Sequence, residues 1–422
     1  IQGLELDVKG TAQAQGSLIN PSYRGSFKFA PFNLRELLNQ LGQELPLTAD
    51  PTVLTKVAID TGLTASSNSL DLKSLSLQLD QSQIGGNLSI VDFAKPALGF
   101  KLVVDRFNAD RYLPPAKPGE SPRAATPAAA AGAAAQLPLP LLRALKVNGD
   151  LNIGKLKIAK ARIRNLNLKI SAQEGNIKLN PISANLYQGK YSGDIGLNAR
   201  GEQAVLTLTE SLTGIQIEPL LTDFRGKARL SGVGDVKARL NATGADMEAF
   251  KRTLSGTAEF AFRDGALKGV NLGLLIRKAQ TGFVGPAEAQ VQTDFSTLQG
   301  TLNLAKGVIG NNDLQAKSPL LRIEGEGSAN LVTEQLDYTL NTTIVATAEG
   351  QGGKELENLK GLTVPIRVSG TFSDPKYRPD LASIAKARVK KELEKQQERL
   401  KSKVEEKLKG KLGKDLFKDL LQ

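Results

Sequence analysis

Alternation of apolar and polar residues with a period of two runs through most of this chain, and this alternation most restricts the fold. Residues 155–170, KLKIAKARIRNLNLKI, show it clearly, because Leu166, Leu168 and Ile170 are separated by polar or basic residues. Such alternation is typical of a strand with one face buried and the other in water. Strand-like runs recur roughly every 8–15 residues, with Gly, Asn, Asp and Ser between them, which predicts antiparallel hairpins and meanders.

One segment interrupts the alternation. Residues 114–136 consist mainly of Pro, Ala and Gly and lack the apolar spacing that packing requires. We predict a disordered linker or a long surface insertion there. It separates a β-rich groove portion over residues 1–113 from a second β-rich portion over residues 137–380.

The last segment, residues 381–422, has a helical pattern, with apolar residues every four or seven positions and a basic excess elsewhere. Three interpretations stay open: a solvated helix, a coiled-coil partner, or an amphipathic helix lying on an anionic membrane surface. The residues expected to contact a membrane or an envelope protein partner are Lys390, Lys391, Lys395, Lys401 and Lys407.

The composition excludes much catalytic chemistry. The chain has no His and no Cys, so the common zinc sites and the catalytic triads built on these residues cannot form. It also lacks a GxxxxGK[ST] loop and a GxGxxG loop that opens a helix. We therefore expect no enzymatic activity, no metal site and no cofactor.

The basic residues have a simple interpretation. Net charge is +12 over 422 residues, and aromatic residues make up only 5% of the chain. Sequence-tolerant binding of single-stranded nucleic acid needs clustered cations beside aromatic platforms, and residues 155–170 contain no aromatic residue. We predict no nucleic-acid partner and interpret these cations as part of the solvent-exposed face of a half-buried sheet.

The apolar side of so many strands must be covered by something. Two sheets could pack as a sandwich, or one large sheet could curl into a trough, because open sheets rarely exceed about 10 strands without curling or splitting. An interior of Leu, Ile, Val and Ala would suit acyl chains better than a shaped polar ligand. The pattern alone supports an open trough and a closed core equally.

Five stretches share one character: LSGTAEFAFRDGALKGVNLGLLI (254–276) and the stretches at residues 295–340, 362–380, 182–197 and 100–115. Together they resemble the AsmA family of bacterial envelope proteins. Each consists of glycines and alternating aliphatic residues, so it is the order of the stretches that is specific.

This resemblance implies a mostly β fold, in which a long antiparallel meander curls into a hydrophobic groove with few short helices and one charged C-terminal helix. It relates the chain to chorein-type bridge-like lipid-transfer proteins. It also implies a periplasmic protein, anchored to the inner membrane by an N-terminal helix absent from this chain. The implied role is phospholipid transfer between inner and outer membranes, or support of outer-membrane biogenesis. The alternative is an assembly scaffold that binds outer-membrane protein clients through strand edges or helix contacts.

In a groove, the apolar positions of the strands are expected to contact phospholipid acyl chains. The predicted lining residues are Leu156, Ile158, Leu166, Leu168, Ile170, Ile177, Leu179, Ile195, Leu197, Leu206, Leu208, Phe260, Phe262, Leu302, Leu304, Leu336, Tyr338, Val364 and Ile366.

Overall fold

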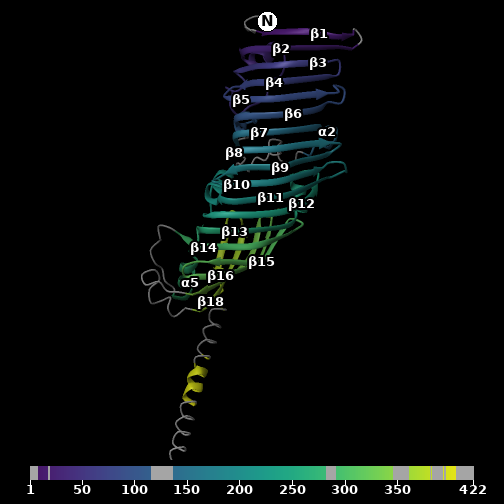
Figure 1. The fold of residues 1–422 in the computed structure, drawn as a ribbon. Helices are drawn as coiled ribbons and strands as arrows, with labels where there is room; N and C mark the ends of the chain where they lie inside the picture. The colour runs from purple at the N-terminus through teal and green to yellow at the C-terminus, as the bar shows by residue number, and fades with distance from the viewer. Residues whose placement is uncertain are drawn as a thin grey trace, which may run out of the picture.

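The computed structural model consists mainly of one sheet of 19 strands, stacked in chain order (Figure 1). It describes residues 8–17, 20–115, 136–281, 291–345, 361–380, 382, 393 and 396–404. The strands are β1 (Val8–Ser17), β2 (Asn20–Phe32), β3 (Val57–Ser66), β4 (Ser69–Leu79), β5 (Ser82–Val91), β6 (Ala97–Asn108), β7 (Lys146–Ile158), β8 (Ala161–Gln173), β9 (Asn176–Leu186), β10 (Gly189–Asn198), β11 (Ala204–Gln216), β12 (Val233–Gly244), β13 (Ser255–Lys268), β14 (Gln292–Ala305), β15 (Val308–Lys317), β16 (Leu321–Asn330), β17 (Gln335–Ile344), β18 (Thr363–Thr371) and β19 (Pro375–Pro379).

Short helices occupy connections between strands. They are α1 (Leu34–Gln40), the 3₁₀ helix η1 (Ala109–Arg111), α2 (Leu139–Ala144), α3 (Ile217–Arg225), α4 (Met247–Thr253) and α5 (Leu272–Thr281). Local caps define some of their ends: the Asp246 side chain accepts a hydrogen bond from the Ala249 amide at the start of α4, and Gly226 ends α3 with a left-handed φ of 74°.

Each strand pairs with the next strand in the chain, and the pairs are antiparallel with one exception. The exception is β6 with β7, which run parallel. A parallel pair needs a crossover connection, and residues 109–145 provide it. One sheet thus runs through both predicted β-rich portions. Most of the predicted linker, 114–136, lies outside the described residues.

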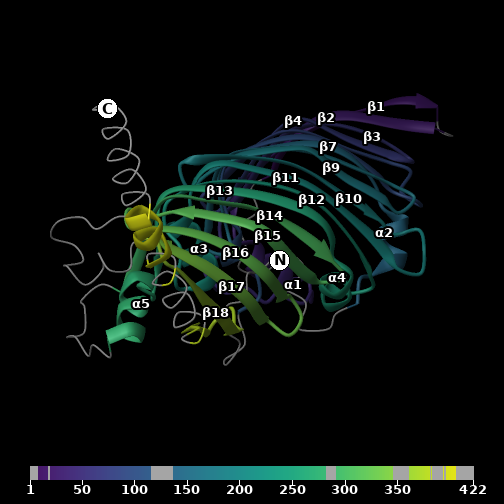
Figure 2. The same ribbon diagram turned by 90° about the horizontal axis from the view of Figure 1, so that it is seen from below.

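The sheet is curled but not closed into a barrel. Figure 2, viewed at right angles to Figure 1, shows the strands bending across their length around a concave side. No pairing joins β1 to β19 within the described residues. The prediction of a mostly β meander curled into a groove, with few short helices, is therefore confirmed, apart from the single parallel pair.

The register aligns apolar residues from strand to strand. Leu168 of β8 lies opposite Leu151 of β7 and Ile182 of β9, and Leu340 of β17 lies opposite Ile366 of β18. We call the face that carries these residues the inner face. Residues of this face from β13 to β17 line one common cavity, so the inner face is the concave one. The alternate positions form an outer face that is largely polar.

The C-terminal end of the sheet curls furthest. Arg229, which precedes β12, donates a hydrogen bond of 2.7 Å from Nη2 to the carbonyl of Ser373, in the turn between β18 and β19. Inside this curl, Leu272 and Ile276 of α5 belong to the largest cluster of buried apolar residues, together with residues of β15 to β18. The concave side is therefore filled by a helix at this end.

Candidate functional site

The predicted lining residues of β7 to β11 lie at inner-face positions, as the cross-strand register shows. All of them are half-buried. They are Leu156, Ile158, Leu166, Leu168, Ile170, Ile177, Leu179, Ile195, Leu197, Leu206 and Leu208. A sandwich core would bury such side chains fully. In the described part of the chain there is one sheet only, so the concave side of these strands has no covering sheet.

Further along the sheet, the inner face borders a cavity of about 370 Å³. Its lining includes four predicted residues, Phe260, Leu302, Leu336 and Tyr338. Phe262 stacks on Phe260 with ring centroids 5.4 Å apart. The remaining walls are almost entirely apolar and include Leu267, Leu272, Phe295, Leu298, Ile309, Leu314 and Leu340. Leu304 occupies the same face of β14 and is half-buried. The volume is in the range of small-molecule pockets.

Two predicted lining residues of β10 and β11 are partly covered. Leu197 and Leu206 pack against a buried cluster that includes Phe250 of α4.

Two further predicted lining residues are not on the open part of the face. Val364 and Ile366 have no exposed surface at all, because α5 packs over this end of the sheet through Leu272 and Ile276. They belong to a packed core in this structure. Sequence periodicity gives their face correctly but cannot show which distant helix covers it.

Two polar side chains that line this cavity bond to each other. The Tyr338 hydroxyl donates a hydrogen bond to Oδ1 of Asn311, whose Nδ2 donates to the Thr301 carbonyl at 2.8 Å. Burial raises the pKa of the Tyr338 hydroxyl, and the nearby charges of Asp313 and Glu326 add to this effect. The hydroxyl therefore stays neutral, and the cavity keeps an uncharged wall.

Glu210 is an exception to the apolar inner face. Among the residues paired in the described strands, Glu210 is the one Asp, Glu, Lys or Arg that the register puts on the inner face. Its carboxyl lies beside the Tyr191 hydroxyl over Gly193, where a Cβ atom would collide with both groups. Burial raises the pKa of Glu210; contact with Tyr191 opposes the shift and the charge of Asp194 adds to it. The signal was present in the sequence, since Glu210 occupies the apolar phase of Leu206, Leu208 and Leu212, but the prediction missed it.

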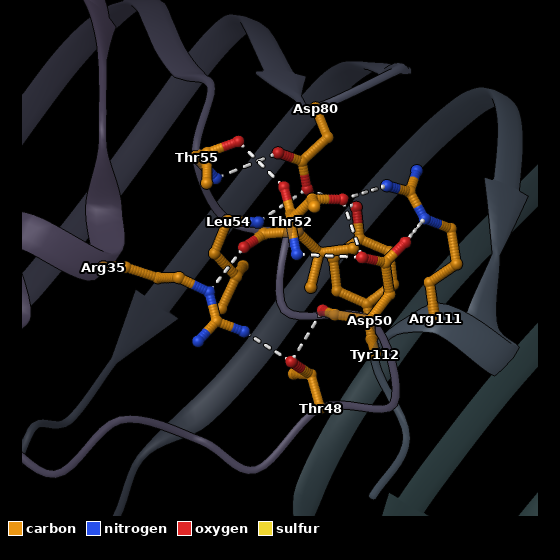
Figure 3. A network of polar contacts seen from close by, with 10 residues as sticks. Arg35, Thr48, Asp50, Thr52, Leu54, Thr55, Asp80, Arg111 and Tyr112 are labelled. Carbon is orange, nitrogen blue, oxygen red and sulfur yellow. Dashed lines mark hydrogen bonds and ion pairs between the residues drawn. The ribbon is translucent and has the colours of Figure 1, made fainter. Parts of the chain in front are cut away.

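One edge of the groove is covered by a polar network (Figure 3). The Arg111 guanidinium binds Asp50, with Nε 2.8 Å from Oδ2, and the Tyr112 hydroxyl donates to Asp80 Oδ2 at 2.7 Å. Asp80 also accepts hydrogen bonds from the amides of Leu54, Thr55 and Lys56. This network fixes the β2–β3 connection against η1.

The two carboxyl groups of this network, those of Asp50 and Asp80, are stabilised in their ionised form. Hydrogen bonds from the side chain and amide of Thr52, and then from Arg111, lower the pKa of Asp50 to about 2. For Asp80, burial acts in the opposite direction, but hydrogen bonds from Leu54 and Tyr112 outweigh it and lower the pKa of the carboxyl. Both groups are therefore carboxylates at neutral pH.

A second cavity, of about 460 Å³, lies beside this network where β6, β7 and β8 meet η1. Phe107 and Tyr112 stack in it with ring centroids 5.0 Å apart, and Leu156 and Ile163 complete its apolar wall. Sequence reasoning placed Leu156 on the groove lining. It did not foresee this cavity, which depends on η1 meeting the β7–β8 hairpin.

Of the lysines predicted to contact a membrane or a protein partner, Lys401 is exposed in a helical stretch at residues 396–404. Leu400 and Val404 on the same stretch are also exposed. Lys390, Lys391, Lys395 and Lys407 lie outside the described residues. Among the described helices, none is long and apolar enough to cross a membrane, and the described residues form no cluster of potential metal ligands.

Comparison with known proteins gives a family match. The model of a family described as the AsmA family matches residues 24–314. Protein AsmA of Escherichia coli (strain K12) is 23% identical over 341 residues, which cover 76% of this chain and 54% of that protein. The chain thus spans about half the length of this curated relative. No solved structure matches it.

Proposed function

The chain belongs to the AsmA family, and from this premise we propose that it holds phospholipid acyl chains on its inner face and passes them between the two membranes of a bacterial envelope. Such transfer would support outer-membrane biogenesis. The proposal puts the chain in the periplasm, tethered to the inner membrane, with Lys401 and its neighbours free to contact a membrane or an envelope protein.

The observation on which the proposal depends is the apolar inner face of β7 to β9. An aliphatic residue such as Leu168 is half-buried there, although no second sheet of the described residues packs on it. Long exposed apolar surfaces are rare on soluble proteins and mark contact with lipid or partners. Because strands lie about 4.8 Å apart, 19 strands give a face on the order of 85 Å long.

The energetics of such a face suit a conduit. Removing each CH₂ from water is worth about 0.8 kcal/mol, so a 16-carbon chain gains about 12 kcal/mol. The chain is already buried in a bilayer, so its move to an aliphatic groove is nearly neutral, whereas a passage through water is very costly. Sliding along the inner face needs no catalytic residue.

The test adds one carboxylate to either face of the same strand. Leu168→Asp puts a charge on the inner face of β8, while Asn167→Asp puts the same charge on the outer face. Each purified protein is incubated with phospholipid vesicles, recovered without detergent and examined by native mass spectrometry. We expect several lipids per wild-type chain, a severalfold loss in Leu168→Asp and no loss in Asn167→Asp, because an unpaired charge is costly in apolar surroundings.

Circular dichroism and thermal unfolding of both variants report whether the fold is intact. A folded Leu168→Asp protein that still takes up lipid like wild type would contradict the proposal. A wild-type chain that takes up no lipid, but binds an extended peptide from an outer-membrane protein, would favour the scaffold function instead.

A further inference from the structure

The outer face carries a row of basic side chains where β6 to β10 lie in succession (Figure 1). Arg106 of β6 lies opposite Lys155 of β7, and Lys155 lies opposite Arg164 of β8. Asn185 of β9 continues the row to Lys190 of β10. All five side chains are exposed. Because neighbouring strands lie about 4.8 Å apart, the row is about 19 Å long.

A second, shorter row lies at the next outer position of the same strands. There Lys157 of β7 lies opposite Arg162 of β8, and both side chains are exposed. We call the four cations of β7 and β8 the basic patch: Lys155, Lys157, Arg162 and Arg164. Two residues along a strand span about 6.6 Å, so these cations form a grid of about 4.8 by 6.6 Å.

The basic patch puts like charges directly opposite each other, which destabilises a sheet. In other places the outer face offsets such charges with a carboxylate. Lys28 of β2 lies opposite Asp60 of β3, with Nζ 3.6 Å from Oδ2. Arg367 lies opposite Arg378, but its Nη2 also lies 3.1 Å from Oδ1 of Asp337. An anion from outside the chain would offset the repulsion within the basic patch in the same way.

Carboxylates of the chain near the basic patch bind other groups. Asp105 binds Arg106, with Oδ2 3.0 Å from Nε, and Asp110 accepts hydrogen bonds from the amides of Ala159 and Lys160. Three cations of the patch form no ion pair within the part of the chain that the structure describes: Lys155, Lys157 and Arg164. Their charges are therefore open to a partner.

The regular spacing favours a polypeptide partner over a lipid surface. An anionic membrane attracts cations according to their number, so it gives no reason to set them opposite one another. In an extended polypeptide, alternate side chains lie on one side about 6.6 Å apart, which is the spacing of Lys155 and Lys157. Two carboxylates at this spacing would each lie between one cation of β7 and one of β8. The guanidinium groups of β8 can also bind a carboxylate through two parallel hydrogen bonds.

We propose that the basic patch binds an extended acidic segment of a partner protein, with carboxylates at alternate positions. One carboxylate lies between Lys155 and Arg164, and the next lies between Lys157 and Arg162. This contact is on the convex side of the sheet, so it is independent of the proposed lipid transfer along the inner face. A partner bound there leaves the concave side of the sheet open.

The first experiment tests the spacing with two labelled peptides of equal charge, whose binding is measured by fluorescence anisotropy at low ionic strength. Thr-Glu-Thr-Glu-Thr-Glu-Thr has carboxylates at alternate positions, whereas Thr-Thr-Glu-Glu-Glu-Thr-Thr has the same composition without the alternation. We expect the alternating peptide to bind wild type severalfold more tightly, and to dissociate as salt is added, because salt screens exposed charges. Equal affinities would show that net charge alone acts and would overturn the proposal.

The second experiment locates the contact. Lys155→Gln/Arg164→Gln removes two charges of the basic patch, and the control Lys169→Gln/Lys178→Gln removes the same charge from other exposed positions of β8 and β9. We expect the affinity for the alternating peptide to fall about tenfold in the patch variant, because each cation lost weakens an ion pair with the peptide. The control should bind like wild type. Lys155→Arg/Arg164→Lys, which keeps both charges, should retain binding.

Circular dichroism reports whether each variant is folded. An equal fall in affinity in the control would overturn the proposal, because binding would then follow the net charge of the chain. Cosedimentation with phosphatidylglycerol vesicles tests the other occupant. A chain that binds these vesicles through Lys155 and Arg164, but binds neither peptide, would refute the acidic segment and assign the basic patch to a membrane surface.

Discussion

At the scale of single residues, Glu210 is the most informative position, because it puts a carboxyl in an aliphatic wall. Its raised pKa means that the folded chain binds this proton more tightly than the unfolded chain does. The contribution of Glu210 to stability is therefore most favourable below the ordinary glutamate pKa of 4.5 and is lost as the pH rises through the folded-state pKa. Tyr191 beside it keeps a raised pKa as well, through burial and then through Glu210.

We predict that Glu210→Gln stabilises the chain at pH 8, by about 1–3 °C in melting temperature, and has little effect at pH 4. The amide removes the cost of a half-buried charge that is present only at the higher pH. Thermal unfolding of wild type and variant at both pH values measures this. Glu259→Gln, on the exposed outer face of β13, is the matched control. The same shift at both pH values would refute the assignment.

At the scale of elements, α5 closes the groove at the C-terminal end. Ile276 has no exposed surface and packs with Val364 and Ile366. We predict that Ile276→Ala lowers the local free energy of unfolding by about 2–5 kcal/mol, measured as faster amide hydrogen exchange in β17 and β18. Leu47→Ala, at a position that is 78% exposed, should leave exchange unchanged. Unaltered protection in Ile276→Ala would mean that α5 does not stabilise this end.

The polar network around Asp50, Asp80 and Arg111 also makes a contribution to stability that can be tested. Asp50 has its pKa lowered to about 2, by Thr52 first and then by Arg111. The contribution of Asp50 to stability is therefore complete above the ordinary aspartate pKa of 3.8 and declines as the pH falls towards 2. The amides of Ala49 and Asp50, bonded to the carbonyls of Leu113 and Arg111, report on it.

We predict that Asp50→Asn increases hydrogen exchange at these two amides at pH 7, because the bond to Arg111 loses its charge. Asp60→Asn, whose partner Lys28 lies 3.6 Å away on the exposed surface, is the control. Equal exchange in wild type and Asp50→Asn would show that Arg111 is held by other contacts.

At the scale of the whole molecule, the period-two alternation predicts the strands, and the register then determines which residues face one another. Leu168 and Leu208 could be placed on one face from sequence because local backbone geometry fixes the alternation. The burial of Val364 beneath α5 could not be predicted from sequence, because it depends on a helix nearly 100 residues earlier in the chain. The second cavity could not be predicted either, because the parallel β6–β7 pair is needed to bring Arg106 beside Lys155. The cations there were interpreted only as a wet outer face.

The strict neighbour-to-neighbour order of the strands also sets how such a chain can change over evolutionary time. Apart from β7, every strand pairs antiparallel with the strand before it, so a new hairpin can be inserted without rethreading the rest. Each inserted pair lengthens the sheet by two strand spacings, on the order of 10 Å. The length of the sheet is therefore adjustable in discrete steps, by the gain or loss of whole hairpins.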